Sequence, residues 1–206
     1  MRTTIAALLV SALLPAPSFA AAPAAAPPVP PCCREIQPGT ILTDRSVYQL
    51  DSEWTSDFGR RIRLGVLSGR PQVVAMFFTH CEYACPILVH DLRRIEQALP
   101  PDVRGKVDFL LVTMDHERDT PAVLREYRSL RRLPAERWTL LHGGAEAVRE
   151  LAAVLGVNYR RDARGQYLHS NLVTLLDSRG EVVRQLTGLN QDITSFVTAI
   201  VETASN

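Results

Sequence analysis

The sequence predicts an α/β fold in which helices flank a mixed central sheet. Runs of β-prone apolar residues alternate with helical patterns along most of the chain. Two of these runs, at 72–79 and 107–113, are almost continuously apolar, as strands covered on both faces require. Two further runs, at 172–176 and 181–186, flank the turn residues 177–180 and predict a C-terminal hairpin.

A hairpin is also expected at the N-terminal side of this sheet. The stretches 47–54 and 58–64 alternate in polarity and are separated by Ser56-Asp57. Gly69-Arg-Pro71 then interrupts the chain before the strand at 72–79. We therefore expect the first hairpin to be an extension of the central sheet.

A helical pattern follows the first buried strand. Pro86 suits the first turn of a helix, where its missing N–H costs nothing. Pro100-Pro101 ends the segment. Between them, apolar residues recur at helical spacing: Ile87, Leu88, Leu92, Ile95 and Leu99.

The strand at 107–113 is followed by a second helix. Asp119-Thr-Pro121 predicts its start, with Asp119 or Thr120 as the capping residue and Pro121 just inside. Its apolar face is expected to comprise Val123, Leu124, Tyr127 and Leu130.

The remaining elements complete the alternation. Residues 138–141 predict a short strand, residues 145–155 a helix that Gly156 ends, and residues 191–202 a last helix. A first βαβ unit with cysteines at its strand-to-helix turn, followed later by a hairpin and a helix, matches the thioredoxin architecture. The predicted fold class is therefore thioredoxin-like, with an N-terminal hairpin extension.

Composition excludes some classes of function. The 206-residue chain is 46% hydrophobic and 22% charged, as expected of a folded globular protein. Its net charge is +1, and Arg2 is the only charge in the first twenty residues, so the rest is close to neutral. Such a chain has no broad field to attract nucleic acid, and no nucleic-acid partner is expected.

The first twenty residues predict a signal peptide (1–20). Arg2 supplies the positive charge, residues 5–14 an apolar stretch, and Ser18-Phe-Ala20 a small-residue cleavage site. The apolar stretch is shorter than the roughly 20 residues that span a bilayer, so an uncleaved anchor is the alternative. We expect an exported or periplasmic protein, N-terminally tethered at most, without a transmembrane domain in its mature form.

An Ala/Pro-rich spacer (21–37) follows, because residues 21–31 are all Ala, Pro or Val and favour extended backbone. It also holds Cys32 and Cys33. The folded domain is predicted to occupy residues 38–206.

The four cysteines form two pairs, and in an exported chain both could be structural disulfides. Cys81 and Cys85, however, lie where a buried strand enters a helix. A helix N-terminus stabilises thiolates, and spacing i, i+4 places both sulfurs on one face. This placement favours a functional pair.

His169 precedes the strand at 172–176, at the loop where the thioredoxin fold approaches its cysteine turn. Two thiolates and one imidazole suit Cu(I), which prefers soft ligands. Zinc would usually require a fourth ligand.

Three sequence motifs occur in the same order as in the Sco/SenC family, and together they resemble that family over roughly residues 39–204. They are Phe77-Phe-Thr-His-Cys81-Glu-Tyr-Ala-Cys85-Pro86, Thr113-Met-Asp115-His-Glu-Arg-Asp119-Thr-Pro121, and His169-Ser170. The resemblance implies copper held by Cys81, Cys85 and His169, as Cu(I), with Cu(II) as the alternative oxidation state. It implies that Asp115 and Asp119 lie behind these ligands or contact a docking partner.

The family resemblance also implies a metallochaperone that helps to build the dinuclear copper centre of a respiratory oxidase subunit. Its partner would be that copper-receiving subunit or another copper carrier. The alternative is an enzyme, a thiol–disulfide oxidoreductase that uses Cys81 and Cys85 as its redox-active pair. Copper binding requires His169, whereas thiol exchange does not.

Several residues depart from the family pattern or lie beside it. Glu82 places an acidic group next to the first thiolate, and His116 stands where a proline is common. Cys32 and Cys33 belong to none of the motifs and could bind copper, pair between chains or exchange with the other two. His80 is expected to have a structural role, because it would point to the opposite face from residue 81.

Overall fold

The computed structural model describes residues 42–163 and 165–205. The predicted signal peptide and the whole spacer, with Cys32 and Cys33, lie outside the described residues. The domain boundary at residue 38 therefore stays a prediction. Among the residues that are described, no helix is long and apolar enough to cross a membrane.

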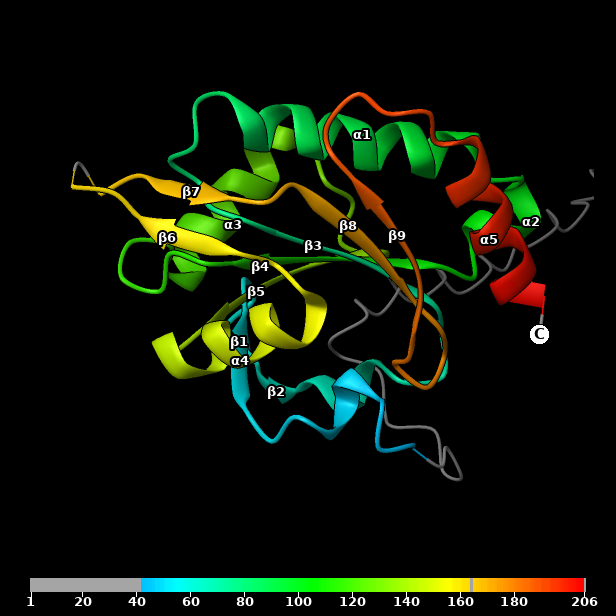
Figure 1. The fold of residues 1–206 in the computed structure, drawn as a ribbon, viewed down its shortest axis with the longest axis horizontal. Helices are drawn as coiled ribbons and strands as arrows, with labels where there is room; N and C mark the ends of the chain where they lie inside the picture. The colour runs from blue at the N-terminus through cyan, green and yellow to red at the C-terminus, as the bar shows by residue number, and fades with distance from the viewer. Residues whose placement is uncertain (1–41, 164, 206) are drawn as a thin grey trace, which may run out of the picture.

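A mixed seven-stranded sheet forms the centre of the fold (Figure 1). Its strands are β1 (Glu53–Ser56), β2 (Arg61–Arg63), β3 (Gln72–Phe77), β4 (Asp108–Thr113), β5 (Trp138–Gly143), β8 (Leu172–Leu176) and β9 (Val182–Thr187). Their order is β2-β1-β5-β4-β3-β8-β9. The pairs β3–β4 and β4–β5 are parallel, whereas β8 runs antiparallel to β3.

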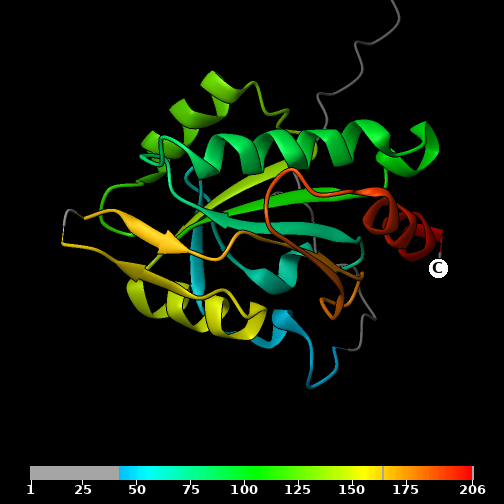
Figure 2. The same cartoon turned by 45° about the horizontal axis from the view of Figure 1, so that its top comes forward.

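Helices cover both faces of this sheet. α1 (Ala84–Ala98) and α3 (Pro121–Arg131) lie on one face, and α4 (Ala145–Leu155) lies on the other, as both views show (Figures 1 and 2). The short α2 (Pro101–Arg104) and the C-terminal α5 (Thr194–Ser205) lie together at one end, where α5 contacts β9. Every residue of β3 and β4 is buried, because helices cover both faces. The predicted thioredoxin-like α/β fold is confirmed.

The N-terminal hairpin is present but shorter than expected. β1 and β2 pair antiparallel, and β1 joins the sheet through β5. The flanking residues form 3-10 helices instead of strands: η2 (Val47–Gln49) and η3 (Leu64–Leu67). The Ser46 hydroxyl accepts a hydrogen bond from the Tyr48 N–H and so caps η2.

The predicted apolar face of α3 is wrong at Leu130, whose surface is 74% exposed. The buried residues of this helix are Leu124, Tyr127 and Arg128. At 100° per residue, position 130 is about 120° from Leu124 around the axis. Arg128 takes the inward position because its guanidinium pairs with the buried Asp57 carboxylate.

The sequence patterns predicted neither the short α2 nor a two-stranded ribbon outside the central sheet. β6 (Tyr159–Arg161) and β7 (Tyr167–His169) pair antiparallel and project from one end of the molecule (Figure 1). The ribbon carries His169 on its returning strand. Its position decides whether this histidine can meet the cysteines.

Candidate metal centre

The two cysteines lie on the turn that links β3 to α1. Cys85 is the second residue of α1 and is fully buried, whereas Cys81 precedes the helix and is partly exposed. The Cys85 N–H donates to the Cys81 Sγ at 3.3 Å. The first turn of α1 therefore directs a backbone donor at the outer sulfur, as expected at a helix N-terminus.

The two sulfurs have opposite acidities. The Cys85 thiol donates a hydrogen bond that lowers the pKa of Cys81 to about 5, and backbone N–H groups of residues 83–85 add to this effect. Donation to Cys81 raises the pKa of Cys85, and burial raises it further. In the reduced metal-free pair, Cys81 is therefore a thiolate at neutral pH and Cys85 is a thiol.

His169 reaches this pair from the ribbon. Its Nε2 lies 3.9 Å from the Cys85 Sγ, although the two residues are 84 positions apart in the chain. Its Nδ1 lies 3.1 Å from the Ser170 carbonyl oxygen, which can only accept, so Nδ1 carries the proton. In the tautomer that this contact favours, the Nε2 lone pair faces the sulfur, the arrangement that metal-binding histidines require.

The ring of His169 is also held by an aromatic contact. The rings of Phe78 and His169 meet edge to face, with 5.9 Å between their centroids. Phe78 also contacts Tyr167, with 5.4 Å between the ring centroids. The Cys85 Sγ thus lies beside the His169 Nε2 at the mouth of α1, and Cys81 is next to Cys85, although the donor atoms of the three residues do not all lie within 4.8 Å of one another. Such soft donors fit Cu(I). The structure places Cys85 next to both Cys81 and His169, and the binding of metal by the three residues stays a prediction.

Asp119 has a different role from the one its sequence position suggested first. The cap of α3 is Thr120, whose hydroxyl accepts from the Val123 N–H. The buried Asp119 carboxylate instead accepts hydrogen bonds from the Thr79 N–H, the Thr79 hydroxyl and the Thr113 hydroxyl. It therefore anchors the beginning of the cysteine turn to the end of β4.

Asp115 is fully buried and pairs with Arg118. Ligand atoms of His80, Asp115 and Asp119 lie within 4.8 Å of one another. Arg118 pairs with the Asp115 carboxylate, and three neutral donors satisfy the Asp119 oxygens, so both carboxylates already have protein partners. His80 itself is half-exposed and lies 3.0 Å from the Thr79 hydroxyl. This group supports the cysteine turn.

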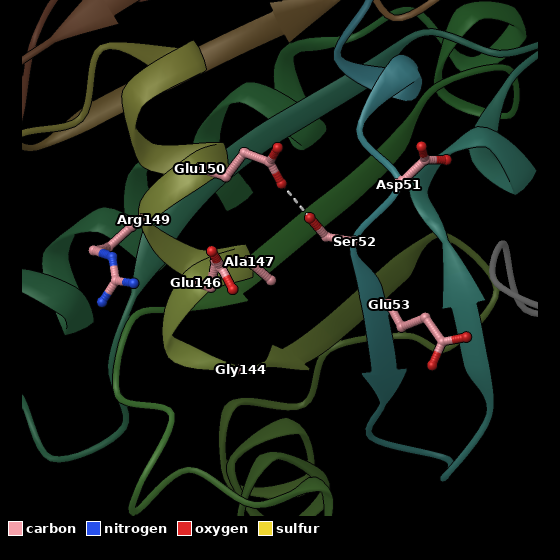
Figure 3. Close-up of a pocket in the computed structure, with 8 residues that line it drawn as sticks. All are labelled: Asp51, Ser52, Glu53, Gly144, Glu146, Ala147, Arg149 and Glu150. Atoms are coloured by element: carbon pink, nitrogen blue, oxygen red, sulfur yellow. Dashed lines mark hydrogen bonds between the residues drawn. The ribbon is translucent and has the colours of Figure 1, made fainter.

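A separate hollow of about 760 Å³ lies between β1 and the start of α4 (Figure 3). Four carboxylates and one guanidinium contribute to its lining, and Ser52 donates to one of the carboxylates, that of Glu150. Its lining residues are Asp51, Ser52, Glu53, Gly144, Glu146, Ala147, Arg149 and Glu150. Oxygen donors of this kind lack the sulfur and imidazole ligands that copper prefers. The hollow is not part of the candidate centre.

Comparison with known proteins agrees with these features. A family model described as SCO1/SenC matches residues 43–205. A Stutzerimonas stutzeri protein, named provisionally as a copper-binding protein, is 30% identical over 120 residues. That match covers 56% of this chain and 57% of the relative, so the chain spans little more than half of that relative's length.

Two solved structures show the same fold. Yeast Sco1 with copper bound is 25% identical, with a TM-score of 0.63 over 75% of this chain and 87% of that one. BsSco, described as a member of the Sco family of cytochrome c oxidase assembly proteins with a disulfide switch, is 18% identical. Its TM-score is 0.65 over 77% of this chain and 94% of that one. The expected copper is thus present in a solved relative.

Proposed function

The chain belongs to the SCO1/SenC family, and from this premise we propose that it carries Cu(I) as cargo on Cys81, Cys85 and His169. The observation that supports the proposal most strongly is the 3.9 Å approach of the His169 Nε2 to the Cys85 Sγ. Copper in the yeast relative supports it as well. The recipient is the copper-binding subunit of a respiratory oxidase, or another copper carrier.

The exposure of the ligands supports transfer to a partner. Cys81 is partly exposed, whereas Cys85 is fully buried behind it. A thiolate or thioether of a partner would therefore replace the outer sulfur first. Ligand exchange of this kind passes Cu(I) on without a change in its charge.

Cu(I) binding by the reduced protein tests the proposal. The probe is Cu(I) in competition with a chromophoric Cu(I) chelator, in a background with Cys32→Ser and Cys33→Ser. We expect one Cu(I) per chain, with affinity lost on Cys85→Ala and lowered on His169→Ala. Because soft ligands must be deprotonated, affinity should also fall in acid.

A matched control is His90→Ala, which removes an exposed histidine on α1 outside the candidate centre. This variant should bind as the parent does. Parental affinity in either Cys85→Ala or His169→Ala would refute the proposed ligand set.

A second function, thiol–disulfide exchange, is favoured by the opposite acidities of the cysteines. The Cys81 thiolate would attack one sulfur of a partner's disulfide, and the other partner sulfur would leave as a thiolate. Cys85 would then lose its proton and attack the Cys81 sulfur, which releases the second partner thiolate. Two electrons pass to the partner, and the Cys81–Cys85 disulfide forms. Reduction of a model disulfide that is unaffected by His169→Ala would favour this function.

We propose that the protein is exported, because both proposed functions require it outside the cytoplasm. Residues 1–20 support export, because small residues follow a short apolar stretch there, as in a signal peptide. The Ala/Pro-rich segment comes after them. The N-terminal residue of protein recovered from the exported fraction tests this proposal. A start near residue 21 is expected, and an intact Met1 in the cytoplasm would refute it.

A further inference from the structure

We propose that Arg118, together with the Glu117–Arg161 ion pair, positions the histidine-bearing ribbon against the cysteine turn. The ribbon is defined here as β6, β7 and the described residues between them. The inference rests on the proposed function, because the position of the ribbon matters for copper only if His169 is a ligand. Arg118 acts through His169 and does not itself contact the sulfurs.

The ribbon needs outside support to hold its position. It forms a two-stranded sheet of its own, separate from the central sheet. Isolated two-stranded ribbons are marginally stable in water. At its base, the Ser170 N–H donates to the Asn158 carbonyl at 2.9 Å, and the Asn158 N–H donates to the Ser170 hydroxyl at 3.0 Å.

The outer end of the ribbon is held by the loop between β4 and α3. The Arg118 Nη2 donates to the Gly165 carbonyl at 2.7 Å, while its Nε donates to the buried Asp115 carboxylate. Beside it, Arg161 of β6 donates to the Glu117 carboxylate at 2.6 Å. Asp115 is fixed in turn, because its N–H donates to the Thr113 hydroxyl at 3.0 Å.

The same loop also anchors the cysteine turn. Asp119, one residue beyond Arg118, accepts hydrogen bonds from the N–H and the hydroxyl of Thr79. One short segment, residues 115–119, therefore holds the sulfur side of the centre through Asp119 and the imidazole side through Arg118. The separation between His169 and Cys85 follows from both attachments.

A double-mutant cycle tests whether Arg118 acts through His169. Arg118→Gln is measured in the parent and in His169→Ala, by competition for Cu(I) with a chromophoric chelator. Partners that orient a ligand typically change metal affinity 10–100-fold. We expect Arg118→Gln to lower affinity about tenfold in the parent and less than twofold in His169→Ala. An equal loss in both backgrounds would overturn the inference.

The position of the ribbon can be measured without copper. Amide hydrogen exchange is followed in the reduced metal-free protein at Asp162 and Ser170, whose N–H groups donate to the Gln166 and Asn158 carbonyls across the ribbon and at its base. Arg118→Gln should accelerate exchange at these amides at least about tenfold, while β3 and β4 keep parental protection. Unchanged exchange in the ribbon would also overturn the inference.

Three further variants serve as controls, including for misfolding. Arg118→Gln leaves the buried Asp115 carboxylate unpaired, so Asp115→Asn combined with Arg118→Gln removes both charges together. Glu117→Gln breaks only the exposed ion pair to Arg161 and should give a smaller effect in the same direction. Arg63→Gln, which breaks an exposed pair with Asp51 on another edge, should leave ribbon exchange and copper affinity as in the parent.

Failure of the inference and failure of the proposed function are distinguishable. If His169→Ala binds Cu(I) like the parent, the proposed ligand set is refuted, and with it the role of Arg118 in copper binding. If His169→Ala weakens binding but Arg118→Gln does not, the ligand set stands and the inference falls.

Discussion

The acidity of Cys81 can be tested by removing its strongest cause, the hydrogen bond from the Cys85 thiol. With a pKa of about 5, Cys81 is about 90% thiolate at pH 6, whereas an ordinary cysteine with pKa about 8.5 is about 0.3% thiolate. Cys85→Ala removes the donor, so the midpoint should rise by at least about one pH unit. Cys85→Ser keeps a hydroxyl donor at the same place and should rise less.

The assay is the rate of Cys81 alkylation by iodoacetamide between pH 4 and pH 9, in reduced protein that carries Cys32→Ser and Cys33→Ser. The midpoint of the rate profile is the readout, because low-pKa thiolates are intrinsically weaker nucleophiles and absolute rates would mislead. The parent should reach half its maximal rate near pH 5.

Two results would refute this reasoning. One is a parental midpoint above about pH 7, which would mean that the helix N-terminus and Cys85 do not stabilise the thiolate. The other is the same midpoint in Cys85→Ala and the parent, which would assign the acidity to the backbone donors alone.

Three further predictions concern stability, measured by guanidinium unfolding of the reduced metal-free protein. Asp119→Asn should lower the free energy of unfolding by about 1–3 kcal/mol, because its amide nitrogen cannot accept the hydrogen bonds that the second carboxylate oxygen receives. Arg128→Ala should cost about 3–5 kcal/mol, because it leaves the buried Asp57 unpaired. Gly180→Ala should cost about 2–4 kcal/mol, since residue 180 has φ +82° and the added Cβ would lie 2.6 Å from the Tyr48 ring.

A different result would contradict each of the three stability predictions. Parental stability in Asp119→Asn would mean that the Thr79 and Thr113 hydrogen bonds contribute nothing net. A smaller loss in Arg128→Ala than in an exposed-pair variant such as Arg63→Gln would contradict the role of the buried pair. For Gly180→Ala, a stable variant would require Tyr48 to move without cost.

Much of the fold could be predicted because its strongest signals are local. The residues of β3 and β4 are covered on both faces, so they appear in the sequence as nearly continuous apolar runs. Gly156 ends α4 in a left-handed conformation, as its position predicted. The exposed Leu130 could not be foreseen, because Arg128 turns inward only through a partner 71 positions away, Asp57.

The candidate ligand residues could be predicted from the sequence, but the groups that orient them could not. Cys81, Cys85 and His169 stand in motifs, whereas the proton on the His169 Nδ1 depends on a carbonyl that only the folded loop presents. Arg118 gave no signal, since charged residues in a loop are usually solvated. The ribbon offered one: Asp162 and Gly165 are turn-forming residues between two short stretches that contain Tyr159 and Tyr167.

The sulfur and imidazole donors enter the centre from segments 84 residues apart. A bound ion that joins them therefore closes a long loop of chain, much as a covalent crosslink does. For a disulfide, closing a loop of this length removes unfolded-state entropy worth on the order of 4 kcal/mol. If the proposed ligands bind copper, the bound ion would thus stabilise the fold, and its release would leave the protein easier to unfold.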